Sequence, residues 1–292
     1  MTGVLTDGLV RPHFLYVGAA RAGSTWIYRM LSNHPEIFVP VAKDIQYFDD
    51  HYHLGLDWYL AHFQEGVGKI CGEVSHDYFV RPGALRRIAE DLGGVKLLCC
   101  LREPGDRARS TYEFESAIGL TAGASFVQWA EAPSIRAANA YVENMRAMHA
   151  LFPAENIFTY YFDDIVEDPE GLVEAVYRFL GVDPSFRSPL LRERINAAHT
   201  PRVNWLAHLA YGTAQVMRRH GLANWVGRIK HWPAFEHLLY RRGGDGAPPI
   251  PADAIAALRR EAAATYPELE RLVGRAVPSS WHATAGLSPP SP

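Results

Sequence analysis

The sequence is poor in cysteine, in net charge and in long apolar runs. It contains 3 cysteines in 292 residues, and two of them, Cys99 and Cys100, are adjacent. This spacing suits neither a disulfide framework nor a zinc site, so we expect reduced, buried thiols. A formal net charge of −3 gives no reason to expect nucleic-acid binding. No apolar run approaches the ~18 residues that a membrane-spanning helix needs.

The sequence also lacks an internal repeat and, over Met1–Pro12, the apolar segment of a signal peptide. We therefore expect a cytoplasmic protein. Apolar residues make up 48% of the chain and charged residues 21%, as in a soluble globular protein with a sizeable core. We expect one domain over residues 1–292.

Short apolar runs alternate with helical patterns through residues 13–200, which we take as a nucleotide-binding core. The predicted strands are His13–Val17, Lys69–Val74, Val95–Leu101 and Asn156–Tyr161. The predicted helices lie near residues 24–33, 55–63, 82–92, 104–118, 137–151 and 169–180. Such alternation predicts an α/β fold, a three-layer and mostly parallel sheet flanked by helices. Ligands of such sheets bind at the carboxyl ends of the strands.

The pattern changes beyond residue 200. Residues 201–250 combine helical spacing of apolar residues with an excess of basic side chains, and we interpret them as a C-terminal helical cap. The basic side chains are either simply solvated or belong to a lid over an acceptor site or to a face that meets anionic lipid. Residues 252–275 predict an amphipathic helix, and residues 283–292 a disordered tail.

The stretch from Gly18 to Trp26 is the most informative in the chain. It follows a short apolar run and opens a helical pattern, so strand, glycine-containing turn and helix start succeed one another. Such a turn lets the backbone wrap an anion, and the first free N–H groups of the helix point at it. The spacing is P-loop-like, but Ser24 stands where a nucleotide P-loop carries lysine, and the nearest cation is Arg21. This displacement disfavours ATP or GTP hydrolysis and favours another phosphate-bearing donor.

A second anion-binding pattern follows the strand Val95–Leu101. That strand ends in Arg102, Pro104 suits the first turn of a helix, and Ser110 lies about two turns later. A nucleotide hydrolase would have a magnesium-binding aspartate at this strand end. A guanidinium instead holds an anion directly. Two anion sites without an obvious metal site imply a nucleotide with two separate phosphate groups.

These motifs resemble those of the sulfotransferases that use 3′-phosphoadenosine 5′-phosphosulfate (PAPS). Arg21-Ala22-Gly23-Ser24-Thr25 is similar to the family's [KR]-x-G-[ST]-T loop, and Arg102 with Ser110 matches its 3′-phosphate pair. Further similarities, in the family's order, are His34-Pro35-Glu36-Ile37, Lys43-Asp44-Ile45-Gln46-Tyr47-Phe48, Gly72-Glu73-Val74-Ser75-His76-Asp77-Tyr78 and Phe179-Leu180-Gly181-Val182. The resemblance covers about residues 13–200, the final helix and Trp281.

The resemblance implies in-line transfer of a sulfuryl group from PAPS, without a metal, to a hydroxyl or, less favoured, an amine. Arg21 would neutralise the charge of the leaving phosphate, and Arg102 with Ser110 would clamp the 3′-phosphate. Arg202 stands where the family often folds a basic loop over that phosphate. The other residues expected to bind the donor are Ala22, Gly23, Ser24, Thr25 and Trp26. Trp26 would lie against the adenine or pack its helix on the sheet.

The acceptor's proton needs a base. By the resemblance, Asp44 aligns with the glutamate that serves as base in the branch similar to heparan sulfotransferases, although its side chain is one methylene shorter. His76, just after a predicted strand, is the competing candidate. Lys43 would orient Asp44 or contact sulfonate oxygens, and Glu73 would either support the loop or take part in catalysis.

Two other functions remain open at this point. A kinase with a degenerate P-loop would depend on ATP and magnesium. A catalytically inactive module would use the same cradle to bind phosphorylated or sulfated ligands. The acceptor can be a small molecule, a glycan or a glycolipid, and the sequence specifies neither the acceptor nor the oligomeric state.

Overall fold

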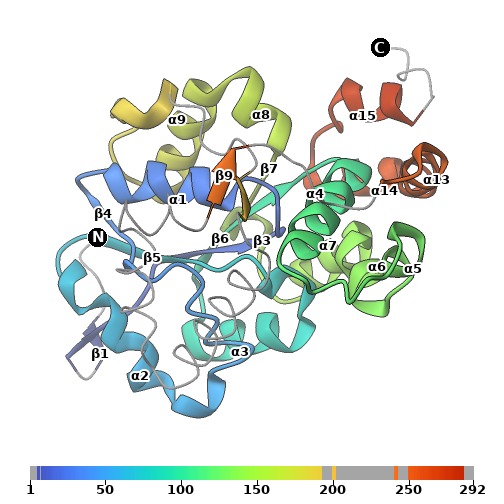
Figure 1. The fold of residues 1–292 in the computed structure, drawn as a ribbon. Helices are drawn as coiled ribbons and strands as arrows, with labels where there is room; N and C mark the ends of the chain where they lie inside the picture. The colour runs from blue at the N-terminus through green and yellow to red at the C-terminus, as the bar shows by residue number, and fades with distance from the viewer. Residues whose placement is uncertain (1–4, 7, 193–198, 202–239, 243–248, 286–292) are drawn as a thin grey trace.

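The computed structural model describes residues 5–6, 8–192, 199–201, 240–242 and 249–285 (Figure 1). Its centre is a five-stranded sheet in the order β4-β5-β3-β6-β7, and every pairing in it is parallel. The strands are β3 (Phe14–Gly18), β4 (Ile37–Phe38), β5 (Ile70–Val74), β6 (Lys96–Leu101) and β7 (Ile157–Tyr161). The four strands predicted from the sequence are confirmed. β4 was missed because two residues leave no period to detect.

Helices cover both faces of the sheet, which confirms the three-layer α/β prediction. Figure 1 shows α1 (Ser24–Asn33), α8 (Phe162–Glu167) and α9 (Pro169–Leu180) above the strands, and α2 (Leu56–Leu60) and α3 (Pro82–Leu92) below them. The other helices of this region are α4 (Pro104–Ala117), α5 (Phe126–Ala130), α6 (Pro133–Asn139) and α7 (Tyr141–His149). Because both faces are covered, the strands are almost entirely buried.

The order of the strands positions the site. β3 lies between β5 and β6, so Leu15 pairs with Glu73 on one side and with Leu97 on the other. The turn after β3 therefore meets the residues that follow β5 and β6 at one edge of the sheet. That edge is the carboxyl end of parallel strands, where such sheets bind ligands.

The C-terminal segment differs from the prediction in two respects. The single helix expected over residues 252–275 is two, α13 (Ala252–Ala263) and α14 (Tyr266–Val273). Pro267 lies in the first turn of α14, where a backbone N–H would have no partner within the helix, so its absence costs nothing. Inside one continuous helix the same proline would remove a hydrogen bond and clash with the preceding turn, so the helix breaks there. The first two residues of the disordered tail expected over residues 283–292 are instead helical and belong to α15 (Ser279–Thr284). Buried Trp281 packs against the rings of Tyr161 and Tyr266 and anchors α15.

The predicted cap over residues 201–250 lies almost wholly outside the described residues. What is described there is strand β9 (Tyr240–Arg242), paired antiparallel with β8 (His199–Pro201). A further two-stranded ribbon, β1 (Leu5–Thr6) with β2 (Leu9–Val10), precedes the main sheet. Residues 286–292, the rest of the predicted tail, are also outside the described part.

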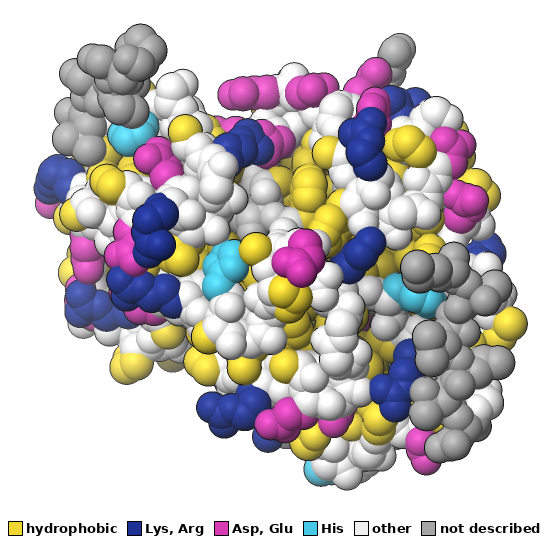
Figure 2. Space-filling model, turned by 180° about the vertical axis from the view of Figure 1, so that it is seen from behind, with side chains coloured by type: hydrophobic (Ala, Val, Ile, Leu, Met, Phe, Trp, Pro, Cys, Tyr) yellow, Lys and Arg dark blue, Asp and Glu magenta, His cyan; other side chains and the backbone are white. Residues whose placement is uncertain are grey.

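Acidic and basic side chains are interspersed on the face seen in Figure 2, and hydrophobic side chains gather in a hollow near its centre. The coloured part of this face shows no extended basic patch. Within the described ranges, no helix is both long and apolar enough to span a bilayer.

Candidate active site

The turn between β3 and α1 leaves no room for side chains at its two glycines. Gly18 has φ 152°, and a Cβ there would lie 2.7 Å from Cβ of Phe79 and 2.9 Å from the carbonyl oxygen of His76. Gly23 has φ 87° and is the N-cap of α1, and a Cβ there would lie 2.5 Å from Cδ1 of Ile165. Both positions therefore need glycine, and the backbone comes close to its surroundings as an anion cradle requires.

The helix start provides donors that the helix itself does not use. The N–H of Ile27 makes the first hydrogen bond of α1, 3.1 Å to the carbonyl of Gly23. The amides of Ser24, Thr25 and Trp26 precede it and have no partner within the helix. They carry the positive end of the helix dipole. These amides are the backbone donors that the expected phosphate cradle needs.

Arg21 lies in this turn with φ 62° and reaches across to helix α4. Its Nε donates to Oγ of Ser110 at 3.1 Å, and its guanidinium lies 4.8 Å from the centre of the Phe114 ring. Desolvation by the surrounding protein, and then the like charge of Arg102, lower the pKa of Arg21. Two cations close together favour an anionic ligand between them.

Arg102 follows β6 and is held on both its backbone and its side chain. Its carbonyl accepts from the hydroxyl of Tyr141 at 2.8 Å, and Nη1 donates to the carbonyl oxygen of Arg21 at 3.0 Å. Its guanidinium stacks 4.6 Å from the centre of the Phe162 ring. The structure thus brings Arg21, Arg102 and Ser110 together, as the sequence analysis required. The two anion-binding patterns of the sequence are therefore adjacent in the structure, because Arg21 contacts both Ser110 and Arg102.

Phe162 was missed by the sequence analysis. It directly follows Tyr161, the last residue of β7, and so lies at the carboxyl edge of the sheet. Its position directly after a predicted strand could have identified it as a candidate site residue. The ring of Trp26, expected beside the adenine or in the core, is only 5% exposed, which favours the packing interpretation. Arg202 lies outside the described residues.

Two further arginines, Arg107 and Arg109, lie on α4, and the sequence pattern alone favours solvated charges at both positions. Arg109 is exposed, whereas Arg107 is 2% exposed and donates to Oδ1 of Asn139. That prediction is wrong for Arg107 because its face of α4 is covered by other elements.

Lys43 places an ammonium group at the start of α1. Its Nζ donates to Oγ of Ser24 at 2.9 Å and to Oγ1 of Thr25 at 3.2 Å. The lysine that a nucleotide P-loop carries at the position of Ser24 is absent from this turn. A lysine from another loop provides the charge there instead.

Asp44 and His76, the competing base candidates, are in contact. Oδ1 of Asp44 lies 2.6 Å from Nδ1 of His76, while Nε2 of His76 lies 3.7 Å from Oδ2 of Asp77. The side chain of Asp44 is 9% exposed and that of His76 28%. Burial lowers the pKa of His76, but the negative charges of Asp44 and Asp77 outweigh it, and the pKa is raised. The two residues form one proton-binding pair.

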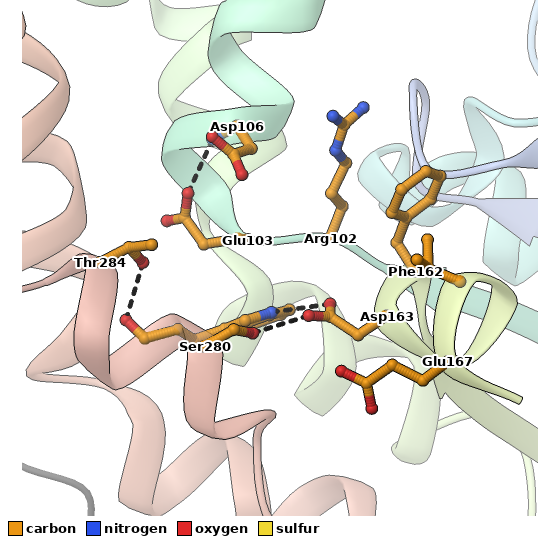
Figure 3. Close-up of a pocket in the computed structure, with 10 residues that line it drawn as sticks. Arg102, Glu103, Asp106, Phe162, Asp163, Glu167, Ser280 and Thr284 are labelled. Carbon is orange, nitrogen blue, oxygen red and sulfur yellow. Dashed lines mark hydrogen bonds between the residues drawn. The ribbon is translucent and has the colours of Figure 1, made fainter.

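A cavity of about 230 Å³ has Arg102 and Phe162 among its lining residues (Figure 3). Carboxylates dominate its lining, and several are already engaged. Glu103 accepts from two amides of α4, and Asp163 accepts from Ser280 and from the Trp281 indole. This acidic lining does not suit an anion, whereas the turn after β3 offers amides and guanidinium groups. Among the described residues, no three His, Cys, Asp or Glu side chains cluster so as to hold a metal ion.

The fold and the site together define an α/β protein with a P-loop-like anion cradle. A family model described as "Sulfotransferase domain" matches residues 11–200, and the chain therefore belongs to the sulfotransferase family.

Proteins similar in sequence or structure are also named as sulfotransferases. The "Membrane-associated sulfotransferase kil1" of Dictyostelium discoideum is 33% identical over 110 residues, which cover 36% of this chain and 23% of that protein. The human "Bifunctional heparan sulfate N-deacetylase/N-sulfotransferase 3" is 28% identical over 198 residues, 60% of this chain and 23% of that protein. The chain thus spans less than a quarter of the length of these relatives. The crystal structure of a sulfotransferase from Alicyclobacillus acidocaldarius shares the fold, with a TM-score of 0.66 at 21% identity over 94% of this chain and all of that one.

Proposed function

We propose that this protein transfers a sulfuryl group from PAPS to a nucleophilic group of an acceptor, in the first place a hydroxyl. The observation that carries the proposal is the joining of Arg21, Ser110 and Arg102 over the amides of the turn after β3. Guanidinium groups and helix-start amides are the groups that bind phosphate and sulfonate oxygens.

The residues present fit such a donor. The two glycines whose Cβ positions are filled by neighbours allow close approach of the backbone, and the strand-end position holds Arg102 where a kinase would hold a magnesium-binding carboxylate. PAPS, when bound, supplies the sulfuryl group and leaves 3′-phosphoadenosine 5′-phosphate. Arg102 and Ser110 would hold the 3′-phosphate, and Phe162 offers an aromatic face beside them.

Arg21, Lys43 and the α1 amides would hold the sulfonate and the 5′-phosphate. Lys43 is already aimed at the helix start through Ser24 and Thr25, so its charge is in place before the reaction. Preorganised donors of this kind stabilise the negative charge that develops on the leaving oxygen.

The Asp44–His76 pair would take the proton of the acceptor. His76 is the more exposed partner, and its Nε2 has no neighbour within hydrogen-bond distance among the described residues. We therefore propose that Nε2 of His76 accepts the proton while Asp44 orients the ring through Nδ1 and stabilises its charge. We prefer His76 to Asp44, the candidate favoured by the resemblance, because His76 is the more exposed of the two side chains.

The decisive experiment incubates the protein with ³⁵S-labelled PAPS and a cell extract, then identifies the labelled compound. Transfer of label to any acceptor excludes the inactive binding module. The melting temperature is also measured with 3′-phosphoadenosine 5′-phosphate and, separately, with ATP plus magnesium. A rise with the first ligand and none with the second excludes the kinase. A ligand at 100 times its Kd stabilises by about 2.7 kcal/mol. A shift with ATP alone, and no labelled product, would overturn the proposal.

The acceptor class is part of the proposal. Relatives named as heparan sulfate N-sulfotransferases support glycans, and amines beside hydroxyls, as acceptors to try first. A cytoplasmic location and contact of residues 200–242 with anionic membranes stay predictions. Absence of binding to anionic vesicles at low salt would remove the second.

A further inference from the structure

Glu73 is a buried carboxyl group that the proposed chemistry does not use. It lies in β5, between β4 and β3 in the sheet, and is 1% exposed. Three hydroxyl groups donate to it: Tyr59 at 2.7 Å, Tyr78 at 2.8 Å, and Ser75. A buried carboxyl group is costly even when it is satisfied, and three donors on one such group call for a structural or functional reason.

Two of these hydroxyls continue to the loop that carries Asp44. The N–H of Gln46 donates to Oγ of Ser75 at 3.4 Å, and the N–H of Phe48 donates to the hydroxyl of Tyr78 at 3.4 Å. Each hydroxyl therefore accepts from the loop backbone and donates to Glu73. Both hydroxyls can donate in this way only if the side chain at position 73 accepts hydrogen bonds, as the Glu73 carboxyl oxygens do.

The loop needs such support. Asp44 and Gln46 have φ of 61° and 55°, a left-handed conformation that costs residues other than glycine about 1–3 kcal/mol each. The N–H of Asp44 is tied directly to the carbonyl of Val74, next to Glu73, at 3.0 Å. The position of the Asp44 carboxylate relative to His76 thus depends on bonds between this loop and the end of β5.

We propose that Glu73 is a positioning residue, which acts through the hydroxyls of Ser75 and Tyr78 to set the loop that holds Asp44 against His76. Its effect on turnover rests on the proposed function, whereas its effect on the Asp44–His76 contact does not. Tyr59 provides a matched control. Its hydroxyl also donates to Glu73, but its described links to the loop are contacts of its ring with Tyr47 and Phe48, at 4.7 and 5.1 Å between centres, which phenylalanine keeps.

The test is an NMR titration of the His76 ring, assigned by the resonance that disappears in His76→Gln. Ser75→Ala and Tyr78→Phe each loosen the loop, so the pKa of His76 falls towards its ordinary value as the negative charge of Asp44 moves away from the ring. Tyr59→Phe leaves that pKa at the wild-type value. A purely structural role would lower the thermal stability of all three variants without moving the pKa.

Each outcome decides. The proposal is overturned if Tyr59→Phe lowers the pKa as much as the other two substitutions, or if neither of those two moves it. Should Tyr78→Phe fail to fold, Ser75→Ala decides alone. Where the wild-type protein transfers label from PAPS, the two loop variants also lose about 10-fold in kcat with the Kd of 3′-phosphoadenosine 5′-phosphate unchanged, a fraction of the effect of removing general base catalysis. A wild-type protein that transfers no label, with the titration as expected, refutes the proposed function and leaves the positioning role intact.

Discussion

Oδ1 of Asp44 lies 2.6 Å from Nδ1 of His76, across 32 positions of sequence. The contact joins the loop after β4 to the end of β5, beside the turn that cradles the donor. It makes the two candidate bases a single pair, and it raises the pKa of His76 against the opposing effect of burial. The pH dependence of the proposed proton transfer therefore depends on this one hydrogen bond.

Asp44→Asn should separate the two roles of this pair. Loss of the carboxylate lowers the pKa of His76 and leaves its ring unoriented, so we expect kcat to fall about 100-fold while 3′-phosphoadenosine 5′-phosphate binds as before. The pH profile of kcat checks the mechanism. In the wild type the rate rises as His76 loses its proton, above pH 6.5, and in the variant this rise moves to lower pH. Full activity in Asp44→Asn would place the base elsewhere.

The same substitution has a signature in stability. Because the folded-state pKa of His76 is raised, its pairing with Asp44 stabilises the fold fully below the unfolded-state pKa of about 6.5. That stabilisation is lost as the pH rises through the folded-state pKa. Denaturant unfolding should show the largest difference between wild type and Asp44→Asn near pH 5.5 and a smaller one at pH 9. A difference that grows with pH would contradict the pairing.

Arg102→Ala should weaken donor binding. The variant loses the proposed charge-assisted contact to the 3′-phosphate and the bond from Nη1 to the carbonyl of Arg21. A hydrogen bond to a charged group contributes about 1.5–3 kcal/mol, so the Kd of 3′-phosphoadenosine 5′-phosphate should rise about 10- to 100-fold in calorimetry. Arg109→Ala, at an exposed position on α4, is the control and should bind as the wild type. Equal losses in both variants would point to a general electrostatic effect.

Lys43→Gln should lower both donor affinity and turnover. Its ammonium is held by Ser24 and Thr25 at the helix start, where glutamine keeps a donor but no charge. We expect kcat/KM to fall about 100-fold, within the range found when one preorganised donor is removed. Steady-state kinetics with labelled PAPS measures this. Lys69→Gln, at an exposed position remote from this contact, should show wild-type values. If Lys43→Gln does so too, the charge is not used.

Glu73→Gln should change how stability depends on pH. Burial raises the pKa of Glu73 to about 7 from 4.5, so the folded state binds a proton that the unfolded state has released between these values. Wild-type stability therefore falls as pH rises from 4.5 to 7, by up to about 3 kcal/mol from this group, while glutamine does not titrate. Denaturant midpoints at pH 5 and pH 8 give the comparison. Parallel curves for the two proteins would show that Glu73 has an ordinary pKa.

Much of the fold was predictable because it depends on local patterns. Apolar runs gave the four long strands of the sheet, and proline or glycine at helix ends gave α3, α4 and α9 nearly to the residue. The failures also have local causes. β4 has two residues, too few to show an alternating pattern. The amphipathic pattern of the C-terminal segment predicted one helix, whereas Pro267 lies in the first turn of a second one.

The anion cradle was encoded by the sequence alone, because backbone amides at a glycine turn and a helix start are placed by a few neighbouring residues. The same holds for Arg102 at its strand end. The contacts between side chains that are distant in the sequence were determined only by the tertiary structure. Arg21 reaches Ser110 across 89 positions, and Lys43 reaches Ser24 from another loop. These contacts depend on the order of strands in the sheet and on left-handed backbone at Arg21 and Asp44, which no local preference of arginine or aspartate specifies.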